Sequence, residues 1–176
     1  MRTREVLLLA TVATVAPLWL AGMTGTADGG DATRHPVRTT PAADGPASPD
    51  ARALSVLRRW DRLRSHAWAT GDPAALIRLY VTGSTTGERD ADDLRRWTRR
   101  GLRVAGLRQQ VAELRVTDRH PGRLVLVVTE RTVGGVAAGA SRPTAVPASA
   151  WATHRILMRR TAAGWKVAEA SAQPAR

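Results

Sequence analysis

The chain has 176 residues and a mass of 18.9 kDa, which suits one folded domain around a single buried core. It contains no cysteine, which excludes disulfides, thiolate metal sites, a cysteine nucleophile and a lipid-modified cysteine anchor. The formal net charge is +12, and every basic residue except Lys166 and the histidines is arginine. We therefore expect a generic basic surface and no specific nucleic-acid site.

Residues 1–27 have the composition of an export signal. Arg2 and Arg4 precede an apolar stretch over residues 6–23, and small residues lead to Ala27, where a signal peptidase would cut. A stretch of this length is also near the lower limit for a membrane-spanning helix. The segment is thus either a cleaved signal peptide or an apolar helix that anchors the chain. In both cases we expect the chain beyond residue 27 to be extracytoplasmic, either secreted or held by a single N-terminal transmembrane helix.

Residues 28–47 are rich in Gly, Pro, Thr and Ala without an apolar period, which is typical of a flexible, disordered linker. The folded domain is expected over residues 48–172. Residues 173–176 are expected to form a disordered tail.

Three helices are predicted at the start of this domain. The first covers residues 48–70, where Ser-Pro-Asp provides a cap and an apolar stripe follows at helical spacing. Gly71 ends it, and Asp72-Pro73 begins a short second helix, so this corner is expected mainly to brace the second helix across the domain. Asp90 is expected to cap a third helix that ends near Arg100.

Beyond the third helix the hydrophobic period changes to two, which indicates strands. We expect strands over residues 107–117, 124–133, 149–160 and 165–171, with a long loop or an irregular strand extension over 134–148. Three helices followed by an antiparallel meander predict an α+β fold, in which the helices pack on one face of a strongly curved antiparallel sheet.

Three stretches resemble the SnoaL-like, or nuclear transport factor two-like, superfamily: ATGDPAALIRLYV, DADDLRRWTRRGL and HRILMRRTAAGWKVAEAS. The resemblance covers residues 48–172 and implies a cone, or cystatin-like roll, around an interior hollow. The superfamily holds isomerases, cyclases, dehydratases and members without known chemistry. With its export signal and linker, the chain is also similar to actinobacterial extracytoplasmic accessory proteins, including those associated with lipid-import complexes.

Strand parity selects the candidate catalytic residues. If Met158 faces Val167 in the last hairpin, His154 and Glu169 become neighbours on the inner face, and the preceding hairpin turns Glu130 to the same side. A histidine held by a carboxylate in an apolar cavity suits a general base. The alternatives are solvated strand ends, ion pairs with neighbouring basic residues, and a histidine that only packs in the core.

Four aromatic residues are expected on inward faces: Trp60, Tyr80, Trp97 and Trp165. They either pack in the core or wall a ligand pocket. The sequence has no Gly-rich phosphate loop, no paired metal-ligand spacing and no nucleophile elbow, so we expect no cofactor and no metal.

We therefore expect a non-enzymatic extracytoplasmic domain that binds an apolar small molecule or a protein partner near the membrane. One alternative is a SnoaL-like small-molecule enzyme that uses His154 with a carboxylate. Another is a basic module that adheres to anionic lipid or wall polymer. A homodimer through the sheet face is a further expectation.

Overall fold

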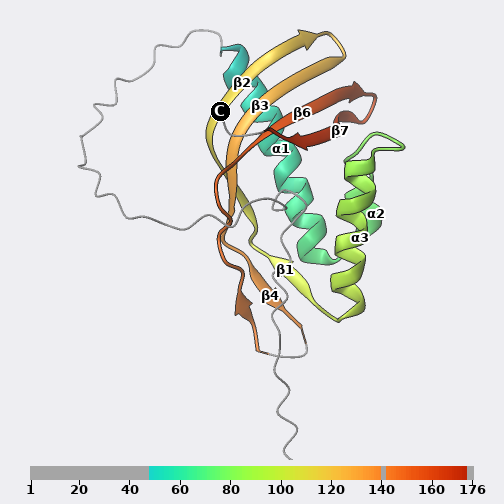
Figure 1. Ribbon diagram of the computed structural model, residues 1–176. Coiled ribbons are helices and arrows are strands. Elements are labelled where there is room, and N and C mark those ends of the chain that lie inside the picture. The colour runs from blue at the N-terminus through green and yellow to red at the C-terminus, as the bar shows by residue number, and fades with distance from the viewer. Residues whose placement is uncertain (1–47, 140–141, 174–176) are drawn as a thin grey trace, which may run out of the picture.

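The computed structural model describes residues 48–139 and 142–173, in which three helices lie on one side of an antiparallel sheet (Figure 1). The α+β class is thereby confirmed. The expected leader, the linker and residues 174–176 of the tail lie outside the described residues. Within the described part, none of the helices has the length and apolar character needed to span a membrane.

Helix α1 (Pro49–Thr70) has the predicted bounds because both of its ends are capped. The Ser48 side chain accepts a hydrogen bond from the Ala51 amide at 3.1 Å, and Gly71 ends the helix in the left-handed conformation, with φ of 68°. The buried residues of α1 recur at three- and four-residue spacing and form one inward stripe: Ala53, Leu57, Trp60, Arg64, Ala67 and Trp68.

Helix α2 (Pro73–Ile77) begins as expected, because the Asp72 carboxylate accepts from the Ala75 amide at 2.8 Å. Helix α3 (Thr85–Arg99) begins earlier than predicted, so the assignment of Asp90 as its cap is wrong. Its cap is Ser84, whose hydroxyl accepts from the Gly87 amide at 3.2 Å.

Gly87 makes the first turn of α3 resemble a loop in the sequence, but its role is to allow a close approach. A Cβ atom at this position would lie 2.6 Å from Cβ and Cγ of Tyr80. Only glycine lets the helix pack directly against that ring.

The predicted meander is confirmed as a sheet with strand order β2-β3-β6-β7, formed by Arg108–His120, Arg123–Val133, Ala152–Thr161 and Gly164–Ala172. A second sheet, β1-β4-β5, was not predicted; its strands are Arg103–Ala105, Val136–Ala138 and Thr144–Ala145. Strands of two or three residues are too short to show an alternating pattern, so 134–148 could be predicted only as a loop or an irregular strand extension.

Glycines divide one long bent ladder into the two sheets. Arg103 pairs with Ala138 in the β1–β4 ladder, and Arg108 pairs with Val133 where the β2–β3 ladder begins. Gly106 lies beside Gly134 and Gly135 between the two ladders, where a Cβ on Gly134 would lie 3.0 Å from the Gly106 oxygen. Together with two bulges in β2, this break curves the strands around α1 (Figure 1).

The outer edge of β7 is paired with the segment that follows α2. The Val81 amide donates to the Val167 oxygen at 2.9 Å, and the Val167 amide donates to the Leu79 oxygen at 3.1 Å. These bonds join the helical layer to the sheet through the main chain.

The outer edge of β2 is covered by α1 instead. Asp50 accepts from the Val116 amide at 3.1 Å, and Asp61 accepts from the Gln109 amide at 3.3 Å. Two outward amides of an edge strand are thus satisfied by carboxylates.

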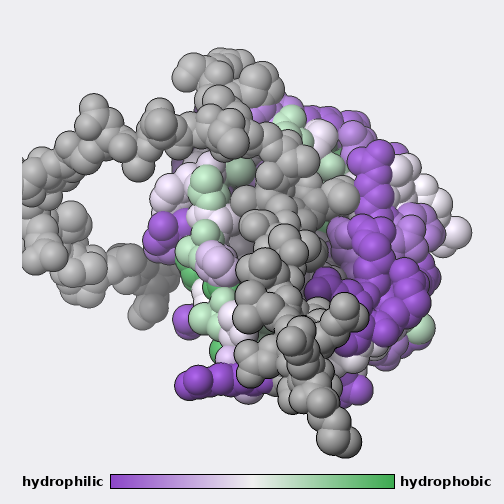
Figure 2. Space-filling model, turned by 60° about the horizontal axis from the view of Figure 1, so that its bottom comes forward, coloured by the Kyte–Doolittle hydropathy of each residue, from purple (hydrophilic) through white to green (hydrophobic). Residues whose placement is uncertain are grey.

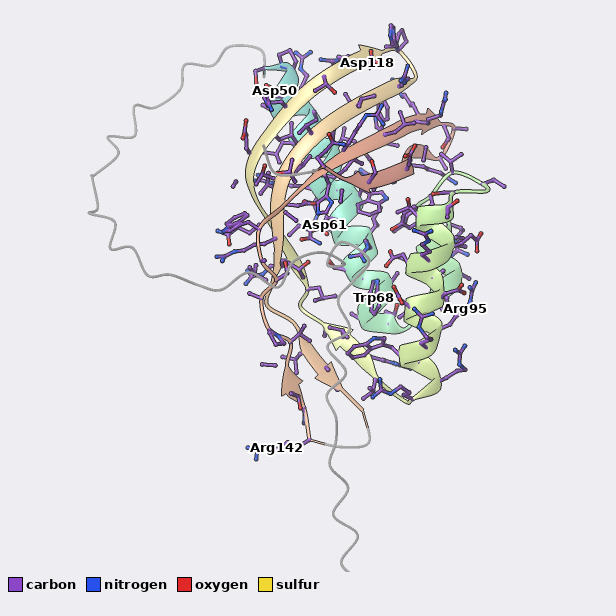
Figure 3. The ribbon with its side chains drawn as sticks, in the orientation of Figure 1. Asp50, Asp61, Trp68, Arg95, Asp118 and Arg142 are labelled. Carbon is purple, nitrogen blue, oxygen red and sulfur yellow. The ribbon has the colours of Figure 1, made fainter. Side chains whose placement is uncertain are left out.

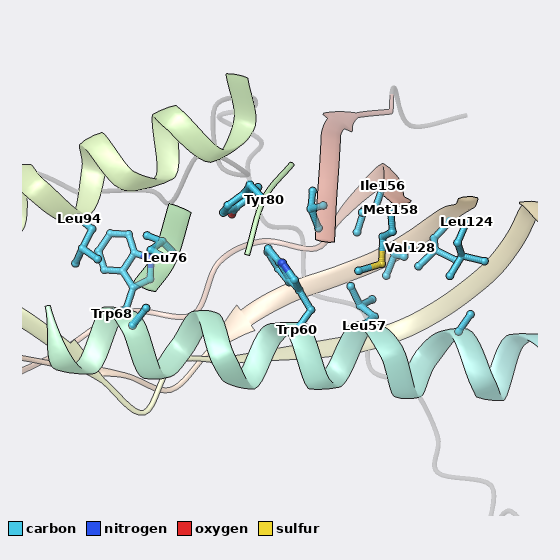
Figure 4. Packing of buried hydrophobic residues seen from close by; sticks show 14 of the residues in the cluster. Leu57, Trp60, Trp68, Leu76, Tyr80, Leu94, Leu124, Val128, Ile156 and Met158 are labelled. Atoms are coloured by element: carbon cyan, nitrogen blue, oxygen red, sulfur yellow. The ribbon is translucent and has the colours of Figure 1, made fainter. Parts of the chain in front are cut away.

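The core lies between α1 and the concave face of the sheet (Figure 4). Its largest fully buried side chains are Tyr80, Leu76, Leu94, Leu126, Ile156 and Met158, together with Val128 and Val167. Hydrophilic side chains gather on the side of the molecule where α3 lies (Figure 2).

Candidate functional site

A small cavity, here called the inner chamber, lies between α1 and the sheet. Its apolar walls include Leu57, Trp60 and Ile156, and its polar groups include Asp61 and Glu130. Its volume is about 20 Å³, which is room for about one water molecule. The interior hollow implied by the resemblance is therefore almost filled by side chains.

Two carboxyl groups that line this chamber, those of Asp61 and Glu130, have raised pKa values. Burial raises the pKa of Glu130 to about 7, with the charge of Asp61 adding to the effect and Arg64 opposing it. Burial also raises the pKa of Asp61, while the charge of Arg64 and the hydrogen bond from the Gln109 amide lower it. A proton can therefore reside on Glu130 close to neutral pH.

His154 lies on the same inner face as Glu130, as strand parity predicts. His154 pairs with Val128 and Glu130 with Ala152, so the two side chains are diagonal neighbours on adjacent strands. Both are buried, with exposed fractions of 3% and 7%. Burial lowers the pKa of His154 to about 4, which keeps its ring neutral near pH 7.

Glu169 is not part of this group. Met158 does pair with Val167, but a register shift follows, so that Leu157 pairs with Glu169. The one-residue shift turns the Glu169 side chain to the outer face, where it is exposed. The placement of Glu169 beside His154 is therefore wrong.

The four predicted aromatic walls do not enclose one cavity. Trp60 meets Tyr80 edge to face at 5.5 Å between ring centroids, and its Nε1 donates to the Leu79 oxygen at 3.0 Å. Trp97 instead packs against Trp68 at 6.3 Å. Trp165 is half-buried at the far end of the sheet.

Asp90 is the centre of a buried polar network that the sequence did not reveal. Arg64 donates to both of its carboxylate oxygens, at 2.7 and 2.6 Å. The Tyr80 hydroxyl donates at 2.6 Å and Trp68 Nε1 donates at 3.2 Å. Burial and the Asp90 charge raise the pKa of Tyr80 well above its usual value. With four hydrogen bonds accepted, Asp90 ties α1 and the segment after α2 to α3.

A larger cavity, here called the end pocket, opens where α1 begins and where the β2–β3 and β6–β7 hairpins turn. Asp50 and Asp118 mark this end of the molecule in Figure 3. The pocket has a volume of about 510 Å³, within the range of roughly 300–1,000 Å³ typical of ligand sites. Its apolar lining includes Ala53, Val56, Leu124 and Trp165.

Three arginines also line the end pocket, one from each of three elements. They are Arg52 on α1, Arg119 at the end of β2 and Arg160 at the end of β6. None of the lining residues within the described ranges is acidic. Trp165 is the one residue of this pocket that was predicted from the sequence as a pocket residue. The three arginines were not predicted, because arginines at strand ends resemble ordinary solvated charges.

Within residues 48–139 and 142–173, no group of His, Asp or Glu side chains is arranged to hold a metal ion. The prediction of no metal site stays a prediction for the chain as a whole.

No protein-family model matches the sequence, and no curated protein matches it. Solved structures do match the fold. The intermembrane space region of the chloroplast protein ARC6 superposes with a TM-score of 0.54 at 15% identity, over 74% of this chain and 100% of that one.

Two further structures are similar at a lower level. Aln2 from a Streptomyces species has a TM-score of 0.48 at 13% identity, over 72% of this chain and 92% of its own. A Nostoc punctiforme domain with a cystatin-like fold has a TM-score of 0.44 at 14% identity, over 74% of this chain and 80% of its own. At 15% identity, the match to the ARC6 region shows a shared fold and no shared activity. The chain therefore shares the fold of the ARC6 region, an α+β arrangement of the kind that the sequence resemblance implies.

Proposed function

We propose that this chain is an extracytoplasmic domain that binds a small apolar molecule in its end pocket, and that its N-terminal segment exports it and either anchors it or is removed. The observation that carries the proposal is the difference between the two cavities. The end pocket measures about 510 Å³ and the inner chamber about 20 Å³.

The alternative of an enzyme that uses His154 and Glu130 requires a substrate to reach those groups. The chamber that Glu130 lines has room for about one water. Entry of a substrate would therefore require the packing between α1 and the sheet to open. The geometry supports binding at the end pocket better than chemistry at the inner chamber.

Calorimetric titration of the full-length chain with 1-octanol, a neutral apolar probe, tests the proposal. We expect saturable one-to-one binding that weakens about fivefold or more in Trp165→Ala, because the ring contributes apolar wall area. The matched control is Trp151→Ala, which removes an exposed tryptophan that stacks on Arg131 outside the pocket. Absence of saturable binding, or an equal loss in both variants, would overturn the proposal.

A further inference from the structure

The end pocket combines an apolar floor with three arginines that form no ion pair among the described residues. Arg119 pairs with Leu124 across the β2–β3 hairpin, and Arg160 pairs with Trp165 across the β6–β7 hairpin. Directly paired residues point to the same face of a sheet. Each arginine therefore lies beside an apolar residue of the pocket floor.

Helix α1 adds the third guanidinium from the opposite wall. Arg52 and Val56 are four residues apart and share a face of the helix, and both line the pocket. The hairpin turn is held in place below them, because the Arg160 amide donates to the Gly122 oxygen at 3.0 Å. The three arginines thus face one cavity from fixed positions in the main chain.

The nearby acidic side chains have other partners. The Asp118 carboxylate lies 3.1 Å from Arg123 Nη1 and 3.1 Å from His120 Nε2, and Asp50 accepts a hydrogen bond from the Val116 amide. Among the ion pairs of the described residues, none involves Arg52, Arg119 or Arg160.

Guanidinium groups stay ionised at any physiological pH, so three of them around one cavity repel each other. A carboxylate or phosphate relieves this repulsion and matches the planar fork of an arginine with two parallel hydrogen bonds. The apolar floor requires that the same ligand carry a hydrocarbon body.

We propose that the ligand of the end pocket is an amphipathic oxyanion, a carboxylate or phosphate on an apolar body, whose head group is held by Arg119 and Arg160 with Arg52 opposite. This inference rests on the proposed function, because it assigns the ligand class of the same pocket.

The test compares octanoate, octyl phosphate and 1-octanol, which share one alkyl chain and differ in head group. In calorimetric titrations of the full-length chain, at least one of the two anions is expected to bind about tenfold or more tightly than the alcohol. The comparison of octanoate with octyl phosphate then shows which oxyanion the pocket prefers.

Matched charge variants separate the pocket from the overall charge of the chain. The double variant Arg119→Gln/Arg160→Gln is expected to bind the anions and 1-octanol with affinities within about twofold of each other, while its affinity for 1-octanol is retained. The double variant Arg119→Lys/Arg160→Lys is expected to keep part of the preference for anions. Arg99→Gln/Arg142→Gln removes the same charge from exposed positions; Arg142 lies at the opposite end of the molecule (Figure 3). This control is expected to keep the full preference.

The outcomes separate the two proposals. Equal affinity of the wild type for the anions and the alcohol overturns the head-group assignment, but the proposal that the pocket binds an apolar molecule is retained. An equal loss of preference in both double glutamine variants also overturns it, because overall charge would then attract the anion. Absence of binding by all three probes overturns the proposed function and this inference together.

Discussion

At the scale of single residues, the most consequential side chain is Asp90, because its carboxylate accepts hydrogen bonds from three other buried side chains. Its main partner is Arg64, and both side chains are almost completely removed from solvent. A buried ion pair contributes little net stability compared with an apolar pair, but removing one partner leaves an uncompensated charge. The network therefore makes the helical layer sensitive to single substitutions.

We expect Asp90→Ala to lower the free energy of unfolding by about 3–5 kcal/mol, because Arg64 is left charged and unpaired. Tyr80→Phe removes one hydrogen bond to the carboxylate and is expected to cost less, about 1.5–3 kcal/mol. Urea unfolding at neutral pH measures both. The control is Asp92→Ala, which removes an exposed ion pair with Arg95 and is expected to change stability by no more than about 1 kcal/mol. Equal effects of Asp90→Ala and Asp92→Ala would contradict the network.

Glu130 and His154 have opposite effects on the pH dependence of stability. Glu130 titrates at about 7 in the folded chain against an ordinary pKa of 4.5, so between these values only the folded state holds the proton and stability falls as the pH rises. His154 titrates at about 4 against 6.5, so between these values only the unfolded state holds the proton and stability falls as the pH decreases. Each effect amounts to about 3 kcal/mol, and over the shared window they nearly cancel.

Substitution of either residue should expose the effect of the other. In Glu130→Gln, the free energy of unfolding is expected to increase by about 3 kcal/mol as the pH is raised from 4.5 to 6.5, whereas that of wild type stays nearly constant. The reason is that the pH dependence due to His154 is no longer opposed by Glu130. In His154→Gln the free energy of unfolding is expected to decrease by a similar amount as the pH is raised over the same range. Urea unfolding at several pH values across this range measures how the stability of each variant depends on pH. If both variants showed the same pH dependence as wild type, these two side chains would not be the cause of the predicted effects.

At the scale of elements, the protection of the β2 edge by α1 has a measurable consequence. An edge strand with open amides pairs readily with another chain. In Asp50→Ala/Asp61→Ala the Val116 and Gln109 amides lose their acceptors, and we expect concentration-dependent self-association beyond the wild-type mass. Light scattering during size-exclusion chromatography measures it.

The matched variant Asp50→Asn/Asp61→Asn keeps a side-chain oxygen at both positions. It is expected to retain the wild-type mass, because the amides keep an acceptor. Self-association of both variants to the same degree would indicate that lost charge, and not the open edge, is responsible.

The order of the longer elements, and the bounds of α1 and β3, could be predicted because these two elements carry complete local signals. Helix α1 has a cap, a stripe and a glycine stop, and β3 has a continuous apolar run. Glu130 could be placed on the inner face because β3 runs through it without a bulge. Glu169 could not, because the bulge beyond Met158 depends on tertiary pairing and leaves no mark in the alternation of β7.

The same reasoning explains why Asp90 and the end pocket were missed. Hydropathy treats an aspartate as a surface residue, and only its distant partners on α1 make its burial possible. The pocket arginines come from three separate elements, and their convergence is a property of the curved sheet.

At the scale of the whole molecule, the location of the chain remains a prediction from its first residues. A C-terminal fusion to alkaline phosphatase, which requires disulfides formed outside the cytoplasm, is expected to be active. Deletion of residues 2–23 removes the apolar stretch and is expected to abolish that activity while the fusion is still synthesised. Full activity after the deletion would contradict export by this segment.

The pairing of residues 79–81 with β7 also bears on how the domain comes apart. The two amides involved, those of Val81 and Val167, exchange with solvent only when the helical layer separates from the sheet. Because the same segment carries Tyr80, that separation also disrupts the contacts of Asp90. Loosening of the helices and loss of the sheet edge are thus one cooperative event, and hydrogen exchange at these two positions reports its free energy directly.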